Sequence, residues 1–112
     1  MKAVLLSIST LFLAMAASAQ SAPKPTERDL QVAFDRHLKD APSARFRDVQ
    51  LVREGESGVW VMCGYVNAKN AMGAYAGYSR FIGAAVREGK STKYVVMELG
   101  EVADQTCSGR GL

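Results

Sequence analysis

Histidine and cysteine are scarce in this chain, which has one histidine and two cysteines among 112 residues. A structural zinc site needs four ligands, and these three residues cannot supply it alone. The sequence also has no G-x-S-x-G elbow, no EF-hand loop and no paired-carboxylate signature. The single histidine, His37, falls at the edge of a predicted apolar helix stripe, which favours a half-buried structural residue over a general base. We therefore predict no catalytic residue, no metal site and no cofactor.

Long apolar runs are also missing after the first 19 residues. Lys2 precedes an apolar stretch, and Ala17-Ser18-Ala19 has the small-x-small pattern that signal peptidase reads. We expect residues 1–19 to be a signal peptide and the mature protein to begin at Gln20. Because no later run approaches the roughly 20 residues of a transmembrane helix, the sequence predicts a periplasmic or secreted protein without membrane insertion.

A large excess of one charge is absent as well. The chain has 14 basic and 11 acidic residues. Removal of the predicted signal peptide takes away Lys2 and leaves 13 basic against 11 acidic residues, a net charge of +2. Arg45, Arg47 and Arg53 lie close together, but acidic residues interrupt them, which favours a solvated edge over an anion-binding groove. Without clustered Lys and Arg to release counterions, we expect no nucleic-acid partner.

The two cysteines, Cys63 and Cys107, would sit in an oxidising compartment after export. An intramolecular disulfide between them closes a loop of about 45 residues and removes roughly 4 kcal/mol of denatured-state freedom. Such a bond suits a domain of this size, which buries a modest core. The alternatives are an intermolecular pair and a reduced, nucleophilic Cys63.

Hydrophobic periodicity predicts an α+β fold, with one N-terminal amphipathic helix packed on a small, mainly antiparallel four-stranded sheet and one disulfide. The proline-containing segment 20–25 is expected to be a flexible leader that packs on nothing, and 26–112 a single small domain. Thr26 is the predicted N-cap of a helix over 27–40, which Pro42 terminates. The tail, 101–112, should depend on the disulfide for its order.

The expected strands follow from four apolar runs separated by turn signals. A change of phase between Phe46 and Val49 indicates a bulge in the first strand. The second strand is apolar on both faces, which places it in the middle of the sheet, and we expect Trp60 to share one core with Phe34. The four predicted segments are 46–52, 59–66, 73–83 and 93–99.

The most distinctive stretch runs from Cys63 to Phe81. Two asparagines bracket a lysine where a strand should end, and asparagine suits turns through positive φ or side-chain bonds to the backbone. The two tyrosines that follow alternate with glycines, which favours packing of their rings across glycine positions. The competing interpretation is an exposed recognition surface. Under it the candidate binding residues are Asn67, Lys69, Asn70, Tyr75 and Tyr78.

This stretch and the segment LKDAPSARFRDV, which begins at Leu38, resemble the core motifs of an uncharacterised family of small exported bacterial proteins. That family pairs L-K-D-P-x-S-A-x-F with C-G-x-V-N-A-K-N-x-x-G-x-Y-x-G-Y-x-x-F. Here the proline comes one place later, at Pro42. The resemblance covers Leu38 to Phe81 and implies export and a shared small fold, but no activity and no site residue.

These features favour a non-enzymatic exported module that binds another envelope or secreted protein, as an inhibitor, an immunity factor or an envelope accessory protein. The alternative is a small envelope hydrolase or a binder of cell-wall or glycan fragments, with the five candidate residues lining a groove. A third hypothesis is a subunit of an envelope machine. Exposed apolar area would favour the first or third hypothesis, and a concave pocket with buried polar groups the second.

Overall fold

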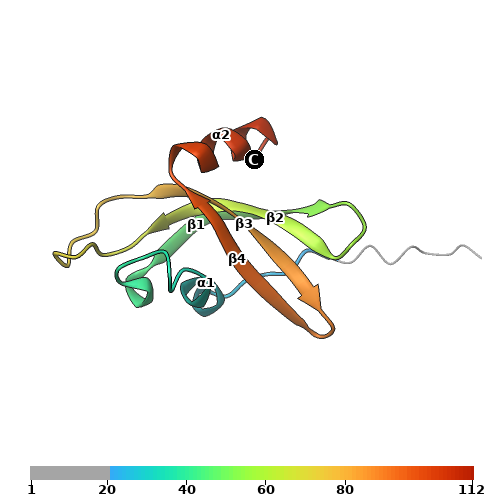
Figure 1. The fold of residues 1–112 in the computed structure, drawn as a ribbon, viewed down its shortest axis with the longest axis horizontal. Helices are drawn as coiled ribbons and strands as arrows, with labels where there is room; N and C mark the ends of the chain where they lie inside the picture. The colour runs from blue at the N-terminus through green and yellow to red at the C-terminus, as the bar shows by residue number, and fades with distance from the viewer. Residues whose placement is uncertain (1–20) are drawn as a thin grey trace, which may run out of the picture.

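The computed structural model describes residues 21–112, and the predicted signal peptide lies outside this range. The four strands form one antiparallel meander in the order β1-β2-β3-β4. Helix α1 and the 3-10 turn η1 lie on one face of the sheet, and α2 lies on the other (Figure 1). The predicted α+β class, with its antiparallel four-stranded sheet and its disulfide, is confirmed. The elements in chain order are α1 (Glu27–Ala33), η1 (Ala41–Ser43), β1 (Arg45–Glu54), β2 (Val59–Asn67), β3 (Ser79–Glu88), β4 (Ser91–Leu99) and α2 (Glu101–Gly109).

Helix α1 begins where the sequence predicts and ends about two turns earlier. Thr26 forms a capping box: its hydroxyl accepts the N–H of Asp29 at 3.1 Å, and the Asp29 carboxylate accepts the N–H of Thr26 at 2.9 Å. The predicted extension to residue 40 is wrong, because the chain turns back there to place η1 beside α1. The amide of Gln31 fixes this return by donating to the backbone oxygens of Pro42 and Ala44.

One further local prediction is wrong because it assumed the longer helix. His37 lies beyond the end of α1 and is exposed, although its ring meets that of Phe34 edge-on at 6.3 Å. In the predicted leader, Pro23 is buried, and residues 22–25 line a shallow depression with Val49 and Leu51. The part of the leader that the structure describes therefore packs on β1.

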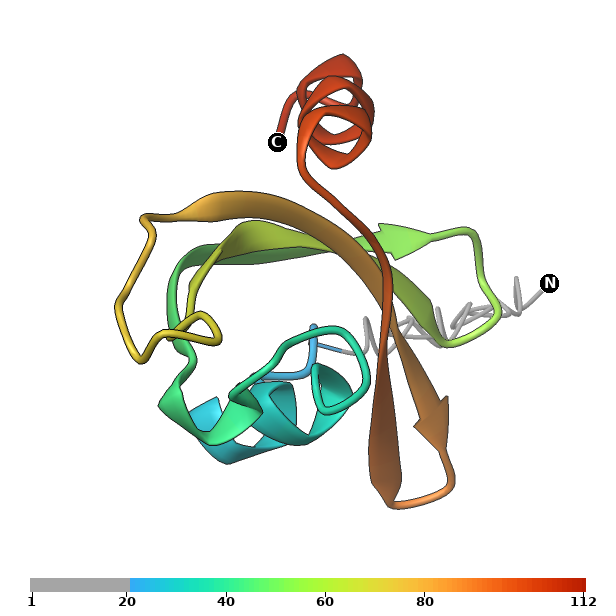
Figure 2. The ribbon, with the colours of Figure 1, turned by 60° about the vertical axis from the view of Figure 1, so that its left-hand side comes forward.

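Strand β2 is the centre of the sheet and is buried along most of its length. Its side chains alternate between two apolar clusters, one under each helix, as the period-2 geometry of a strand requires. The sheet curves around α1 (Figure 2). The cluster on the α1 side contains Leu30, Phe34, Ala44, Met62, Val66, Phe81 and Val96. The cluster on the α2 side contains Val61, Cys63, Ile82, Ala103 and Cys107.

The aromatic packing differs from the prediction in two respects. Trp60 is buried, but it lies outside the cluster that contains Phe34, and the guanidinium of Arg87 lies 5.3 Å from its ring centroid. The ring that covers a glycine is Phe81: a Cβ at Gly64 would approach its Cζ to 2.8 Å. Only glycine leaves room for this ring at the centre of the sheet.

The third strand begins at Ser79, so the predicted strand over 73–83 is wrong in its first half. Gly73 and Gly77 have φ values of 76° and 104°, which belong to turns rather than strands. In contrast, the predicted bulge in the first strand is confirmed. The pairing of β1 with β2 shifts between Arg47 and Gln50, where Asp48 adopts a φ of 50°.

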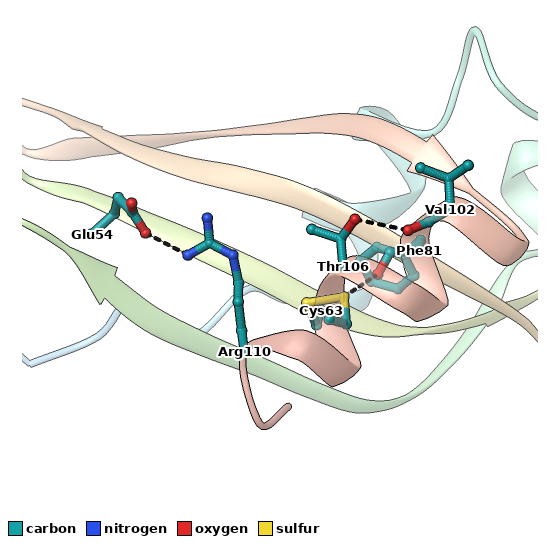
Figure 3. Close-up of a disulfide and its surroundings, with 7 residues drawn as sticks. Glu54, Cys63, Phe81, Val102, Thr106 and Arg110 are labelled. Carbon is teal, nitrogen blue, oxygen red and sulfur yellow. Dashed lines mark hydrogen bonds and ion pairs between the residues drawn. A yellow bond between two sulfur atoms is a disulfide. The ribbon is translucent and has the colours of Figure 1, made fainter.

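Helix α2 is a second helix that the sequence analysis did not predict. The disulfide between Cys63 of β2 and Cys107 of α2 spans 44 residues and lies within the apolar cluster on that face. Near the end of the helix, Arg110 forms an ion pair with Glu54 at 2.8 Å (Figure 3). The expected disulfide is confirmed, and it joins the central strand to a docked helix. Neither helix within residues 21–112 has the length and apolar character needed to cross a bilayer.

Reduction of the Cys63–Cys107 bond should destabilise the protein by about 2–4 kcal/mol, because it releases the denatured chain from a long covalent loop. For a domain of this size the thermal midpoint should fall by about 10 °C or more. Thermal unfolding with and without reductant measures this fall, and intact mass should rise by two hydrogens on reduction. Two free thiols in the purified protein before reduction would contradict this prediction.

The variant Phe34→Ala should cost about 3–5 kcal/mol, because Phe34 is fully buried against Phe81 and Phe46 with ring centroids 5.0 and 5.4 Å away. Val32→Ala is the matched control, since Val32 belongs to α1 and is 59% exposed. The control should stay within about 0.5 kcal/mol of the parent protein in urea unfolding. Equal effects of the two variants would mean that α1 does not bury Phe34 in solution.

Candidate functional site

The loop that joins β2 to β3, residues 68–78, projects past the end of the sheet (Figure 1). The side chains of Asn67 and Asn70 form hydrogen bonds to its backbone. The amide oxygen of Asn70 accepts the N–H groups of Met72 and Ala74 at 2.9 and 3.2 Å. The amide oxygen of Asn67 accepts the N–H of Gly77 at 3.2 Å. Both oxygens act on the loop's own backbone, as expected of asparagine in turns.

The same loop is fastened to η1 on the α1 side of the sheet. The hydroxyl of Tyr75 donates to the backbone oxygen of Ser43 at 2.9 Å, and the N–H of Lys69 donates to the Ser43 hydroxyl at 2.9 Å. Lys69 and Tyr75 also face each other in an isolated antiparallel bridge. The loop is therefore held at both its base and its tip, and its side chains are presented from a fixed backbone.

Beside this loop, arginine and tyrosine side chains form a grid on the sheet, which we call the Arg–Tyr surface: Arg45, Arg47, Tyr65, Tyr78 and Arg80. In the strand register Arg47 lies opposite Tyr65, and Tyr65 lies opposite Arg80. Arg45 lies opposite Asn67 in the next row along the same face. Tyr65 follows Cys63 by two residues on β2, so the two side chains lie on the same face of the sheet. This is the face that α2 covers at Cys63.

Aromatic rings hold the guanidinium groups of this surface. The Arg47 guanidinium carbon lies 5.1 Å from the Tyr65 ring centroid and 4.4 Å from that of Tyr78. Arg80 lies on the strand on the other side of Tyr65, and its guanidinium carbon is 4.7 Å from the Tyr65 ring centroid. Arg45 stacks on the loop residue Tyr75 at 4.6 Å. Each contact is within the range of cation–π attraction.

Carboxylates neutralise little of this positive charge. Within residues 21–112, neither Arg45 nor Arg80 has an acidic group within 4.0 Å. Arg47 approaches Asp48 at 3.8 Å, but both side chains are more than half exposed, so this pair contributes little. The Nε of Arg80 is buried without a hydrogen-bond acceptor among the described residues. The three guanidiniums are thus positioned by rings, and carboxylates of the described residues neutralise little of their charge.

A separate groove of about 720 Å³ lies between α1 and β4. Its lining mixes both charge signs, including Arg28, Asp29, Arg36 and Lys93. Burial raises the pKa of the Tyr94 hydroxyl there, and the nearby Asp29 carboxylate adds to the rise. Tyr94 therefore stays protonated at neutral pH and is not suited to act as a base.

The five residues selected from the sequence occupy two different positions. Asn67 and Asn70 hold the backbone of the loop, whereas Lys69 and Tyr78 are exposed and Tyr75 is half-buried between Arg45 and Ser43. Sequence reasoning missed Tyr65 and Arg80. It also grouped Arg53 with Arg45 and Arg47, although Arg53 lies opposite Trp60 on the other face of β1. Only the strand register brings these residues into one row, and no local motif encodes it.

Comparison of the chain with protein-family models, curated proteins and solved structures found no match.

Asn70→Ala should destabilise the protein by about 1–2 kcal/mol, because it removes the acceptor of two backbone N–H groups. Lys69→Ala is the neighbouring control and should stay within about 0.5 kcal/mol, since the Lys69 ammonium makes only a 5.8 Å approach to the Tyr75 ring. Urea unfolding with unchanged m-values measures both effects. A larger loss from Lys69→Ala than from Asn70→Ala would reverse the roles assigned to these two side chains.

Proposed function

We propose that the protein is a non-enzymatic exported binding module that holds another envelope or secreted protein through the Arg–Tyr surface and the 68–78 loop. An inhibitor, an immunity factor or an envelope accessory protein would act in this way. The observation that carries the proposal is the grid of three arginines and two tyrosines on an uncovered part of the sheet. Arginine and tyrosine, together with tryptophan, are enriched among the residues that supply most of the binding energy at protein interfaces.

The loop supports the same proposal. Met72 at its tip is 91% exposed, and Tyr78 at its base is 40% exposed. An exposed methionine adapts its shape to an apolar partner surface, and an exposed tyrosine adds contact area at a low cost in side-chain entropy. Since Asn67 and Asn70 already fix the backbone, binding would not have to order the loop.

The alternative, a small envelope hydrolase or a glycan-fragment binder, calls for a concave pocket with buried polar groups. No polar or charged residue within 21–112 is buried, and the groove beside Tyr94 is lined by exposed or half-exposed charged groups.

Photo-crosslinking in the producing cell tests the proposal. A photoreactive phenylalanine analogue at Met72 should give a discrete protein adduct, because this side chain projects from the loop. The same analogue at Val32, exposed on α1, is the matched control and should give none. Adding Tyr78→Ala should reduce the Met72 adduct about tenfold, as expected for loss of an interface anchor.

Several results would contradict this function. They are the absence of a Met72 adduct, the same adduct from both positions, or an adduct that Tyr78→Ala leaves unchanged. A thermal midpoint of Tyr78→Ala close to that of the parent protein would show that the loss of adduct is a loss of binding.

A further inference from the structure

We propose that the Arg–Tyr surface is specific for an acidic segment of the partner protein and binds its carboxylates through the arginine forks. This inference rests on the proposed function and names the chemistry of the partner. The surface brings together Arg45, Arg47 and Arg80, and Lys69 lies in the adjoining loop. Asp48 is the one acidic residue within 4.0 Å of these three arginines in the described part of the chain.

The way the guanidiniums are held determines what they can bind. Each of them lies over a tyrosine ring, at 4.4 to 5.1 Å. Stacking uses the flat face of a guanidinium and leaves the N–H groups at the edge of the plane able to donate. In Arg80 these are the terminal Nη groups, because its Nε is buried. Those donors have the fork geometry that pairs with both oxygens of a carboxylate. A stacked arginine is also restricted before binding, so less side-chain freedom is lost when the pair forms.

The spacing of the arginines suits an extended peptide. Arg45 and Arg47 are two residues apart on β1, which separates them by about 6.6 Å along the strand. Side chains on one face of an extended peptide have the same spacing. Arg80 lies two strands away from Arg47, at about 10 Å. Alternate acidic residues of one extended segment could therefore meet Arg45 and Arg47, with Arg80 receiving a carboxylate from a neighbouring position.

The remaining charge distribution favours an acidic protein over a nucleic acid or another long polyanion. The chain after residue 19 carries 13 basic and 11 acidic residues, so the positive charge is local rather than spread along a track. Tyrosine rings alternate with the arginines and would contact the methylene groups of acidic side chains. The phosphate and sulfate groups of a polyanion are not carried on such side chains, whereas the carboxylates of a protein segment are.

Fluorescence anisotropy with two labelled peptides tests the inference. One peptide alternates Glu with Ser, and the other has Gln in place of each Glu. The full exported protein should bind the acidic peptide at least about tenfold more tightly than its amide counterpart, with binding weakened at raised ionic strength.

The double variant Arg47→Lys, Arg80→Lys keeps the net charge but removes two forks, and it should weaken acidic-peptide binding about tenfold. The matched control, Arg28→Lys with Arg53→Lys, makes the same change at two exposed arginines on the α1 side and should stay within about twofold. If the site variant has a lowered thermal midpoint, the single variant Arg47→Lys replaces it, because Arg47 is 55% exposed.

Equal binding of the two peptides would overturn the inference, as would tighter binding of a sulfated oligosaccharide or an oligonucleotide of the same charge. An unchanged affinity in the Lys variants would also overturn it. A Met72 adduct that depends on Tyr78, obtained together with any of these results, would leave the binding function in place and remove only its acidic specificity.

Discussion

Burial of β2 on both faces is the constraint on which the rest of the structure depends. Its side chains contribute to two apolar clusters, one on each face of the sheet, so each face needs an element that shields it from water. Helix α1 supplies one cover, and the disulfide at Cys63 fixes α2 as the other. These helices are short: nine residues make α2 about 13 Å long, whereas the nine residues of β2 extend about 30 Å. Part of the α2 face must therefore remain uncovered, and the Arg–Tyr surface occupies this part.

The composition of that uncovered area follows from its exposure. A bare apolar sheet face invites aggregation, and single lysines would leave the face loosely defined. Arginines that stack on tyrosines keep charge in contact with water while they cover apolar ring surface. In this surface Arg47 and Arg80 take their positions from Tyr65 and not from acidic neighbours. Positioning by rings with little charge neutralisation distinguishes this area from an ordinary solvated face.

Sequence patterns predicted the parts of this fold that depend on near neighbours. The Thr26 cap, the phase change in the first strand and the two-faced second strand all follow from residues within one element. The early end of α1 could not be predicted, because hydrogen bonds of Gln31 to Pro42 and Ala44, 11 and 13 residues away, set it. Helix α2 was missed because its apolar face is small, with Ala103 and Cys107 as its buried residues. Its order comes from docking and from the disulfide.

In the Asn67–Tyr78 stretch, the structural role and the proposed recognition role are compatible with each other. Asn67 is the last residue of β2, lies opposite Arg45 in the register, and accepts the N–H of Gly77 next to Tyr78. The Asn67 side chain thus connects the end of the Arg–Tyr surface to the part of the loop that leads into β3. Asn70 closes the tip from which Met72 projects, while Tyr75 ties the loop to η1 and stacks on Arg45. The asparagines position the tyrosines, and the tyrosines position the arginines, so the turn and the Arg–Tyr surface are built from the same contacts.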